Sequence, residues 1–421
     1  MNPPPLPRRR PEEVRAQRPC PVDAEALAVA APIVEEVLRE GTEALRRHAE
    51  RFDELSAGRL LLNRAELCQA LDALDPARRA LLERTADRID TFARRQRSWL
   101  LAGQHRFPGG AAGQQVAPVQ RAGGYAPGGR HPLPSSVLMT AVTARAAGVE
   151  EVWIASPRPT PLVLAAAAIA GADGLLAAGG AHAIAALAGG VEGLPPCDVV
   201  VGPGGRFVTA AKKIVSGMVG IDTLAGPSEL TVLADGTAPP GWVAADLLAQ
   251  AEHDPLARPV LIALDRNLEL AVQRELTRRL GDLPTAPVAR RALAGGLSVL
   301  AQDLDQAVAL CNRLAPEHLA LHLERPADIV PRLEHYGALF IGSTTAEVLG
   351  DYGAGPNHTL PTGGAARYSG GLSVLDFLRV RTWLRIDDPD RAGEIFRDAA
   401  ALATEEGLVA HARSARLRSR H

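Results

Sequence analysis

The spacing of apolar and polar positions changes along this 421-residue chain and predicts which elements it forms. Between residues 23 and 100, apolar residues recur three and four positions apart, most clearly in 32–41 and 79–92, which predicts helices. From residue 152 onward, short apolar runs alternate with helical patterns. The predicted strands are 152–156, 198–201, 229–233, 259–264, 297–301 and 338–342, and the helices among them include 161–170, 242–251, 267–280 and 304–314. Such alternation predicts βαβ units and a mostly parallel sheet.

The remaining segments carry less periodicity. Residues 1–22 are rich in Pro and Arg, which indicates a flexible N-terminal arm, and the last forty residues have a helical pattern. Residues 101–135 and 343–375 are rich in Gly and Pro and are expected to be loops. A long irregular stretch such as 343–375 is usually either functional or mobile in a compact enzyme.

Composition and charge narrow the class of protein. Hydrophobic residues make up 47% of the chain but aromatic residues only 4%, so small aliphatic side chains must fill the core. The 46 Lys and Arg nearly balance the 48 Asp and Glu, which gives no support to nucleic-acid binding or to an anionic membrane surface. The four cysteines are scattered and form no CxxC pair, and no apolar signal segment is evident, so we expect a reduced, cytoplasmic protein that does not cross a membrane.

Four short segments place chemically active side chains together. Gln250 and His253 lie one turn apart near the end of a predicted helix, where an amide oxygen and an imidazole can bind one metal; the alternative is a helix cap. Glu317 and His318 are adjacent and can act as a proton-transfer pair; the alternative is a solvated Glu beside a packed His.

The other two segments lie nearer the C-terminus. Asp351 and His358 occupy a Gly-rich loop whose backbone can turn tightly and present both side chains inward; the alternative is a turn with an exposed His. Glu406 and His411 are rough neighbours at helical spacing, or simply part of a solvated helix face. Together the four segments offer Gln, His, Asp and His, a ligand set that suits zinc.

Several longer runs resemble the signatures of the histidinol dehydrogenase family, and they occur in the family's order from about residue 30 to 418. They are Pro127-Gly-Gly129, Pro134-Ser-Ser-Val-Leu-Met139, Val201-Gly-Pro-Gly204, Ala225-Gly-Pro-Ser-Glu229, Gln250-Ala-Glu-His253, Pro316-Glu-His-Leu319 and Gly-Pro-Asn-His-Thr-Leu-Pro-Thr362. The resemblance implies two incomplete, aldehyde-dehydrogenase-like Rossmann domains with mostly parallel sheets and helical N- and C-terminal extensions. It would also explain why no GxGxxG turn follows a strand.

On this basis we expect four segments. They are an N-terminal arm (1–22), a first Rossmann-like domain that carries most of the metal site (23–122 with 229–372), a second on the cofactor side (123–228), and a C-terminal helical tail (373–421).

The resemblance also implies an activity and the residues that serve it. The family oxidises L-histidinol to L-histidine in two hydride transfers to NAD, through an aldehyde that stays bound. Zinc would be held by Gln250, His253, Asp351 and His411, and Ser228, Gln250, His253, Glu317, His358 and Glu406 would bind the substrate. His318 would take the alcohol proton and Glu317 would activate water. The resemblance further implies a homodimer in which the tail of one chain completes the active site of the other.

The chain departs from the family on the cofactor side. Tyr125 is present, but His182 stands where relatives usually have Gln, Gly205 where they have Asn, and Leu133 where many have Tyr. Arg206, beside Gly205, either faces a phosphate or is simply exposed.

These departures leave three hypotheses. The chain is a histidinol dehydrogenase, or a paralogous zinc- and NAD(P)-dependent dehydrogenase of another amino alcohol or small polar diol, or a protein that binds zinc and ligand without turnover.

Overall fold

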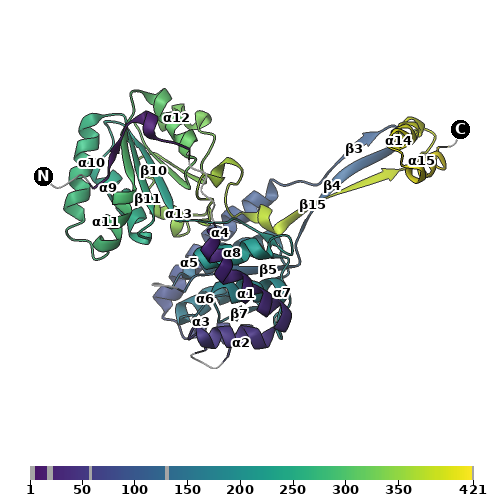
Figure 1. Ribbon diagram of the computed structural model, residues 1–421, viewed down its shortest axis with the longest axis horizontal. Helices are drawn as coiled ribbons and strands as arrows, with labels where there is room; N and C mark the ends of the chain where they lie inside the picture. The colour runs from purple at the N-terminus through teal and green to yellow at the C-terminus, as the bar shows by residue number, and fades with distance from the viewer. Residues whose placement is uncertain (1–4, 17–21, 56–58, 129–131, 420–421) are drawn as a thin grey trace.

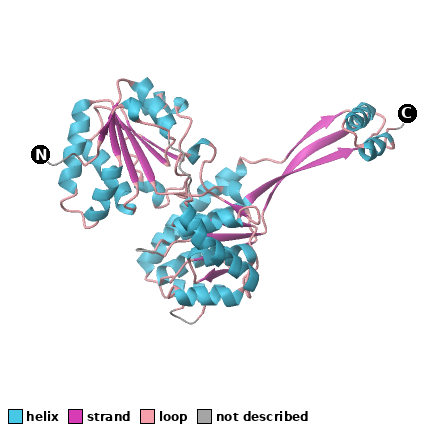
Figure 2. Cartoon of the chain, in the orientation of Figure 1, coloured by secondary structure: helices cyan, strands magenta, loops and turns pink. Residues whose placement is uncertain are grey.

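The computed structural model describes residues 5–16, 22–55, 59–128 and 132–419, and it forms two α/β lobes and a long arm (Figure 1). Each lobe holds one six-stranded sheet covered by helices on both faces, and the arm is a separate three-stranded ribbon that ends in two helices (Figure 2). The predicted fold class, two Rossmann-like domains with mostly parallel sheets, is confirmed.

The first lobe contains a fully parallel sheet in the order β1-β12-β11-β10-β13-β14. Its strands are β1 (Arg8–Arg9), β10 (Glu229–Ala234), β11 (Arg258–Ala263), β12 (Leu297–Leu300), β13 (His318–His322) and β14 (Ala338–Ile341). One face packs on α9 (Pro240–His253), α10 (Arg266–Arg279) and α11 (Ala286–Gly295), and the other on α12 (Leu304–Leu314). The strand order reverses between β10 and β13.

The second lobe repeats the same winding in the order β2-β7-β6-β5-β8-β9, with only β2 antiparallel. Its strands are β2 (Leu61–Asn63), β5 (Arg121–Tyr125), β6 (Glu151–Ala155), β7 (Gly174–Leu176), β8 (Val199–Val201) and β9 (Gly220–Ile221). The helices that follow its strands are α5 (Pro134–Ala147), α6 (Pro161–Ile169), α7 (Gly180–Gly189) and α8 (Arg206–Val215). The reversal here lies between β5 and β8, so the turns after these two strands border the crevice.

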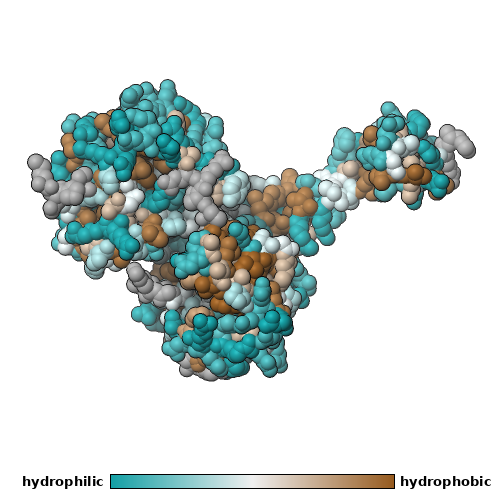
Figure 3. All heavy atoms as spheres, viewed as in Figure 1, coloured by the Kyte–Doolittle hydropathy of each residue, from teal (hydrophilic) through white to brown (hydrophobic). Residues whose placement is uncertain are grey.

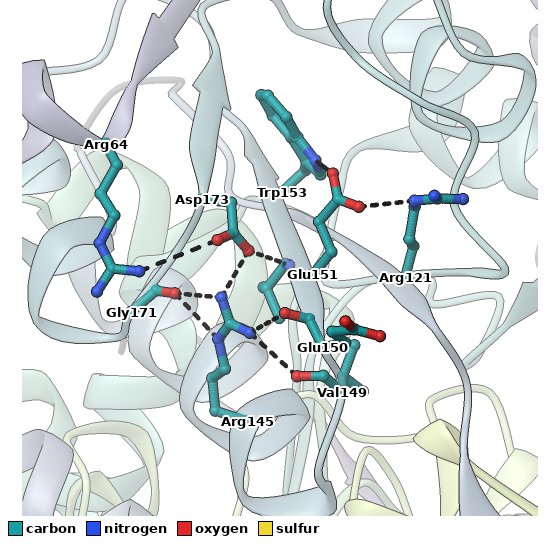
Figure 4. Close-up of polar contacts among 10 residues, drawn as sticks. Arg64, Arg121, Arg145, Val149, Glu150, Glu151, Trp153, Gly171 and Asp173 are labelled. Carbon is teal, nitrogen blue, oxygen red and sulfur yellow. Dashed lines mark hydrogen bonds and ion pairs between the residues drawn. The ribbon is translucent and has the colours of Figure 1, made fainter.

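A half-buried arginine, Arg145, ties the amino ends of β6 and β7 together (Figure 4). The guanidinium of Arg145 donates to the carboxylate of Asp173 at 2.5 Å and to the carbonyl oxygen of Gly171, while Asp173 also accepts from the backbone N–H of Val152. The carboxylate of Glu151 accepts hydrogen bonds from both Arg121 and Trp153. These contacts satisfy polar groups at the edge of the second sheet that faces away from the crevice.

The N-terminal helices differ from the predicted domain division. We expected residues 23–122 to join residues 229–372, and this part of the prediction is wrong, because the helices of this segment cover the second sheet. They are α1 (Ala24–Glu40), α2 (Thr42–Arg51), α3 (Arg64–Asp72) and α4 (Pro76–Ser98). Val34 and Val37 of α1 pack in the same cluster as Leu187 of α7, and Ile89 of α4 packs in that of Leu138. Helical periodicity predicts an apolar face, but it does not say which of two sheets will cover that face.

The two chain ends also gain strands that were not predicted. Within the predicted N-terminal arm, residues 1–4 and 17–21 lie outside the described residues, but Leu6 is fully buried and β1 pairs with β12. A one-turn helix (Pro11–Glu13) follows. Apart from the one-turn helix Val374–Phe377, the predicted C-terminal tail (373–421) is helical only after residue 392, because β15 (Leu378–Ile386) precedes α14 (Gly393–Glu405) and α15 (Val409–Arg416).

The arm pairs β15 with β4 and β4 with β3, all antiparallel. Its other strands are β3 (Gly103–Phe107) and β4 (Gly110–Pro118), so the segment 101–135, expected to be loop, contains three strands when β5 is counted. The segment 343–375 is mostly irregular, as expected, with the short helices α13 (Val348–Asp351), Ala365–Arg367 and Val374–Phe377; two more one-turn helices, Pro326–Asp328 and Val330–Arg332, precede β14. Among the described residues, no helix is long and apolar enough to cross a membrane.

Candidate active site

The Glu317–His318 pair lies at the amino-terminal edge of the first sheet, where the strand order reverses. His318 is the first residue of β13, and it lies beside Leu230 in the neighbouring strand β10. His318 begins a fully buried strand and Glu317 is also buried, so the alternative of a solvated Glu beside a packed His is wrong for Glu317. Both side chains are buried, with 5% of Glu317 and 4% of His318 exposed.

Hydrogen bonds from the backbone of Glu229 orient the pair. Its N–H donates to Oε2 of Glu317 at 2.7 Å, and its carbonyl oxygen lies 3.0 Å from Nδ1 of His318. Because a carbonyl oxygen only accepts, this network assigns the proton of the neutral imidazole to Nδ1 and leaves Nε2 free to accept one. Nε2 lies 3.6 Å from a carboxylate oxygen of Glu347.

Burial shifts the pKa values of the two groups in opposite directions. The pKa of Glu317 is raised well above its ordinary value, mainly by burial and further by the nearby carboxylates of Glu229, Asp351 and Glu347. Burial lowers the pKa of His318, so its imidazole stays neutral over a wider pH range. A neutral imidazole beside a carboxyl group whose carboxylate is unusually basic is an arrangement suited to proton transfer.

Three of the four predicted metal ligands come from two segments that meet beside this pair. Gln250 is 1% exposed near the C-terminus of α9, and its amide Nε2 has no hydrogen-bond partner in the part of the chain that the structure describes. His253 ends the same helix, and its Nε2 lies 3.6 Å from Oδ2 of Asp351 in α13. A possible metal-ligating atom from each of three residues lies within 4.8 Å of the other two; these residues are His318, Glu347 and Asp351. Imidazole nitrogens, carboxylates and a buried amide with an unsatisfied group form a donor set that fits zinc.

Glu347 is a site residue that the sequence analysis missed. It is 1% exposed, and burial together with Asp351 and Asp246 raises its pKa to about 8. The available signal was its position four residues before Asp351, which puts both carboxylates on one face if the segment turns as a helix. We had treated residues 343–375 as loop, so this spacing was not used.

His358 connects the two lobes at the site. Nδ1 of its ring lies 3.0 Å from the carbonyl oxygen of Asp351, and Nε2 lies 3.3 Å from the hydroxyl oxygen of Ser136. Burial lowers its pKa. Ser136 belongs to the first turn of α5, so the predicted substrate residue His358 sits where the second lobe meets the first. Ser228, another predicted substrate residue, directly precedes β10, and its carbonyl oxygen accepts from the N–H of Arg258.

The structure does not bring Glu406 and His411 to these residues. Glu406 follows α14 and His411 lies in α15, and both are exposed at the tip of the arm, far from the two lobes (Figure 1). Within one chain, therefore, the fourth predicted metal ligand and one predicted substrate residue are remote from the others.

The predicted cofactor residues all lie at the carboxyl edge of the second sheet. The hydroxyl of Tyr125, at the end of β5, accepts from the N–H of Gly180 at 3.2 Å, and burial raises its pKa to about 12. Gly205 precedes α8 with an ordinary φ of −68°, and a Cβ atom there would meet nothing within 4 Å. Leu133 precedes α5 on the same edge.

His182 is buried rather than open to a cofactor. Its Nε2 lies 2.8 Å from Oε2 of Glu54, a carboxylate that also accepts from the N–H of Gly179. Its ring stacks on Phe52 with centroids 5.5 Å apart, and its Nδ1 has no partner.

Arg206 is exposed and bound to two carboxylates, at 3.0 Å from Asp23 and 2.6 Å from Glu25. Of the two alternatives for Arg206, this arrangement favours a surface ion pair over a phosphate contact. A cavity of about 850 Å³ near Cys197, Asp198 and Met218 lies elsewhere in the second lobe and includes no predicted site residue.

Comparisons with known proteins agree on one family. The family model for histidinol dehydrogenase matches residues 17–419. The chain is 46% identical over 412 residues to the histidinol dehydrogenase of Thermus thermophilus, covering 97% of this chain and 98% of that protein. It is 46% identical over 396 residues to that of Methylococcus capsulatus, covering 91% and 90%. The crystal structure of histidinol dehydrogenase from Elizabethkingia anophelis superimposes with a TM-score of 0.92 at 29% identity, covering 99% of each chain.

Proposed function

Since this chain belongs to the histidinol dehydrogenase family of oxidoreductases, we propose that it oxidises L-histidinol to L-histidine with zinc and NAD. The observation that carries the proposal is the arrangement of Glu317 and His318, two buried groups held in different orientations by one backbone unit, that of Glu229. Each hydride transfer removes two electrons, so alcohol to aldehyde and aldehyde to acid together reduce two NAD.

His318 serves as the base of the first oxidation. Hydride leaves the alcohol carbon only as its hydroxyl loses a proton, and the unprotonated Nε2 accepts that proton. Burial keeps the imidazole neutral, and the hydrogen bond from Nδ1 to Glu229 fixes the ring and stabilises the imidazolium once it forms. General base catalysis of this kind contributes roughly 10²–10⁴-fold.

Glu317 serves the second oxidation, in which water adds to the aldehyde before hydride leaves. Its carboxylate accepts a proton from that water, and its raised pKa makes it a stronger base than an ordinary glutamate when ionised. A nearby cation would favour the ionised form, because opposite charges within a few ångströms stabilise each other. The aldehyde stays bound between the two steps, since release would expose a reactive compound.

Gln250, His253 and Asp351 would hold zinc together with His411, and bound zinc supplies a Lewis acid that polarises the reacting oxygen. Gln250 would bind through its amide oxygen, and its Nε2, which has no partner among the described residues, would then be available to donate to the substrate. His358, held between Asp351 and Ser136, and Ser228, which precedes β10, would orient the polar groups of the substrate. NAD would be held at the carboxyl edge of the second sheet by Tyr125 and Gly205, with His182 buried behind that edge.

The active form is a homodimer in which each tail completes the partner's site. Glu406 and His411 are far from the other site residues of their own chain, so only a second copy can supply them. Apolar side chains are exposed on the arm and its tip, including Val380, Leu384, Leu402 and Leu417, as the space-filling view shows (Figure 3). Exposed apolar surface of this extent is typical of an interface, and a two-fold axis would bury both tails equally. The proposal keeps the cytoplasmic location expected from the scattered cysteines.

One observation favours a second candidate, a dehydrogenase of another amino alcohol or small polar diol. The two residues at which the family resemblance implies a different side chain, His182 and Gly205, lie on the cofactor side. The imidazole of His182 is already hydrogen-bonded to the carboxylate of Glu54. A changed cofactor pocket with unchanged acid–base residues would fit an enzyme used in another pathway.

The deciding experiment supplies L-histidinol and NAD to the purified, zinc-loaded protein and counts NADH per histidine formed. Two NADH per histidine at an ordinary enzymatic rate supports the proposal, and rescue of a histidine auxotroph would exclude the second candidate. Folded, zinc-loaded protein without turnover would refute the first candidate, and a panel of amino alcohols and diols with NAD and NADP would then test the second.

A further inference from the structure

A second buried His–carboxylate pair lies behind the candidate active site. Nε2 of His322, the last residue of β13, is 3.0 Å from Oδ2 of Asp246 in α9. His322 is 1% exposed and Asp246 8%, and Nδ1 of His322 has no hydrogen-bond partner among the described residues. Neither residue was singled out from the sequence, and neither takes part in the chemistry proposed above.

The pair is one end of two facing rows of polar side chains between α9 and β13, here called the polar seam: Asp246 and Gln250 on α9, and His318 and His322 on β13. Asp246 and Gln250 are four residues apart, so they lie on the same face of α9. His318 and His322 are also four apart, so they lie on the same face of β13. Ala320, between these two histidines, packs in one core cluster with Leu247 and Ala251 of α9, which places the two polar rows face to face.

The seam leads into the active site. β13 begins and α9 ends at the amino edge of the sheet. The step from Asp246 to Gln250 and the step from His322 to His318 therefore both lead toward that edge, where the candidate active site lies. The step is roughly 6 Å along the helix and roughly 13 Å along the strand. Asp246 also contributes to the raised pKa of Glu347. The carboxylate of Asp246 therefore acts electrostatically on the cluster of His318, Glu347 and Asp351.

Stability alone gives little reason for such a pair. Burying an imidazole and a carboxylate costs desolvation, and a well-packed apolar pair of the same volume would usually hold a helix on a sheet as well. A hydrogen bond differs from an apolar contact in fixing direction and register, because it fails if α9 rotates or slides by a fraction of a turn.

We propose that Asp246 and His322 are positioning residues that fix the rotation and register of α9 on β13, so that the amide oxygen of Gln250 faces the metal. This inference rests on the proposed zinc site and deepens it. Groups that orient metal ligands from outside the coordination shell typically affect metal affinity roughly 10–100-fold.

The test measures zinc affinity of the full-length protein by competition with a chelator, and records the Co(II) absorption spectrum as a report on ligand geometry. D246A and H322L break the link, and we expect each to weaken zinc binding roughly 10–100-fold and to alter the Co(II) spectrum. D246N keeps the link without the charge, because its amide oxygen still accepts from Nε2 of His322. It should bind zinc within about threefold of the unsubstituted protein.

H48L is the matched control. His48 is buried and forms another His–carboxylate bond, 2.9 Å to the half-buried Glu36, but in the second lobe, away from the metal site. H48L should therefore lose stability without losing zinc affinity. Thermal melting of every variant shows which ones fold, and the comparison of D246A with D246N decides the matter if H322L does not.

Equal loss of affinity in D246N and D246A would overturn the inference, since the charge and not the position would then matter. Unchanged affinity in folded D246A would overturn it as well, as would the same loss in H48L. If the unsubstituted protein binds no zinc, the zinc part of the proposed function fails, and this inference fails with it.

Discussion

The backbone N–H of Glu229 donates a hydrogen bond of 2.7 Å to the side chain of Glu317. Through this bond, the first residue of β10 fixes a carboxylate that precedes the neighbouring strand β13. The carboxylate is therefore held by the sheet itself rather than by a mobile loop.

This bond makes Glu317→Gln a clean test of the proton-transfer role. The amide oxygen of glutamine can still accept from Glu229, so the fold and the zinc content should be unchanged, while the group can no longer take a proton. We expect the production of NADH from histidinol to fall at least about 100-fold. The measurement is NADH formation alongside zinc content per chain; a parallel loss of zinc would mean that Glu317 is a ligand instead.

The shared active site predicts complementation between two inactive variants. Glu317→Gln removes a catalytic group that the lobes supply, and His411→Ala removes a metal ligand that the tail supplies. Each homodimer should therefore be nearly inactive. A heterodimer of the two, isolated with different affinity tags, contains one site with intact lobes and an intact tail, and should recover about half of the unsubstituted activity. A heterodimer as inactive as its parents would show that each chain uses its own tail.

Introducing at position 205 the Asn that the family resemblance implies should tighten cofactor binding. Gly205→Asn introduces a Cβ into open space at a residue with ordinary φ, and Asn is a favoured residue before a helix, so the melting temperature should not fall. One regained hydrogen bond should lower the dissociation constant for NAD roughly two- to tenfold, as measured by calorimetry. The control is Gly295→Asn, which also points into open space but lies in the first lobe. Equal NAD affinity in both variants would contradict a cofactor contact at Gly205.

Asp376, at the base of the arm, predicts a pH dependence of stability. Burial raises its pKa to about 6 from the ordinary 3.8, and it accepts a hydrogen bond from the N–H of Ser373. Between these two values the folded state holds more protons than the unfolded state, so stability falls as pH rises through this window.

Asp376→Asn removes that titration while its amide oxygen can still accept from Ser373. Its free energy of unfolding relative to the unsubstituted protein should therefore rise between about pH 4 and about pH 7, by at most about 3 kcal/mol. Urea unfolding at both pH values measures this change. A constant difference across the range would show that Asp376 is not protonated in the folded protein.

How far the sequence predicted the fold depends on what each strand packs against. The strands predicted at 229–233, 259–264 and 297–301 are covered by helices on both faces, so they stand out as apolar runs. Strand β15 was missed because it is exposed on both faces and carries three arginines, and it becomes visible only through its pairing with β4.

The candidate site was predicted in part for a similar reason. Spacing alone brought Gln250 to His253 and Asp351 to His358, because these pairs are local. It could not join the two segments to Glu317, since their contact depends on the order of strands in the sheet. The position of His411 depends on the arm, which no periodicity in the tail indicates.

The opposite edges that the two sheets present to the site have an electrostatic consequence. The first lobe offers its amino edge, so α9 ends there, and the carbonyl groups at a helix C-terminus carry a partial negative charge. The second lobe offers its carboxyl edge, so α5, α7 and α8 begin there, each with a partial positive charge. Before any side chain is counted, the helix dipoles thus favour a cation on one side of the site and an anionic nucleotide on the other. The two sheets share one strand topology but face the site with opposite edges, so one side of the site has a negative potential and the other a positive potential.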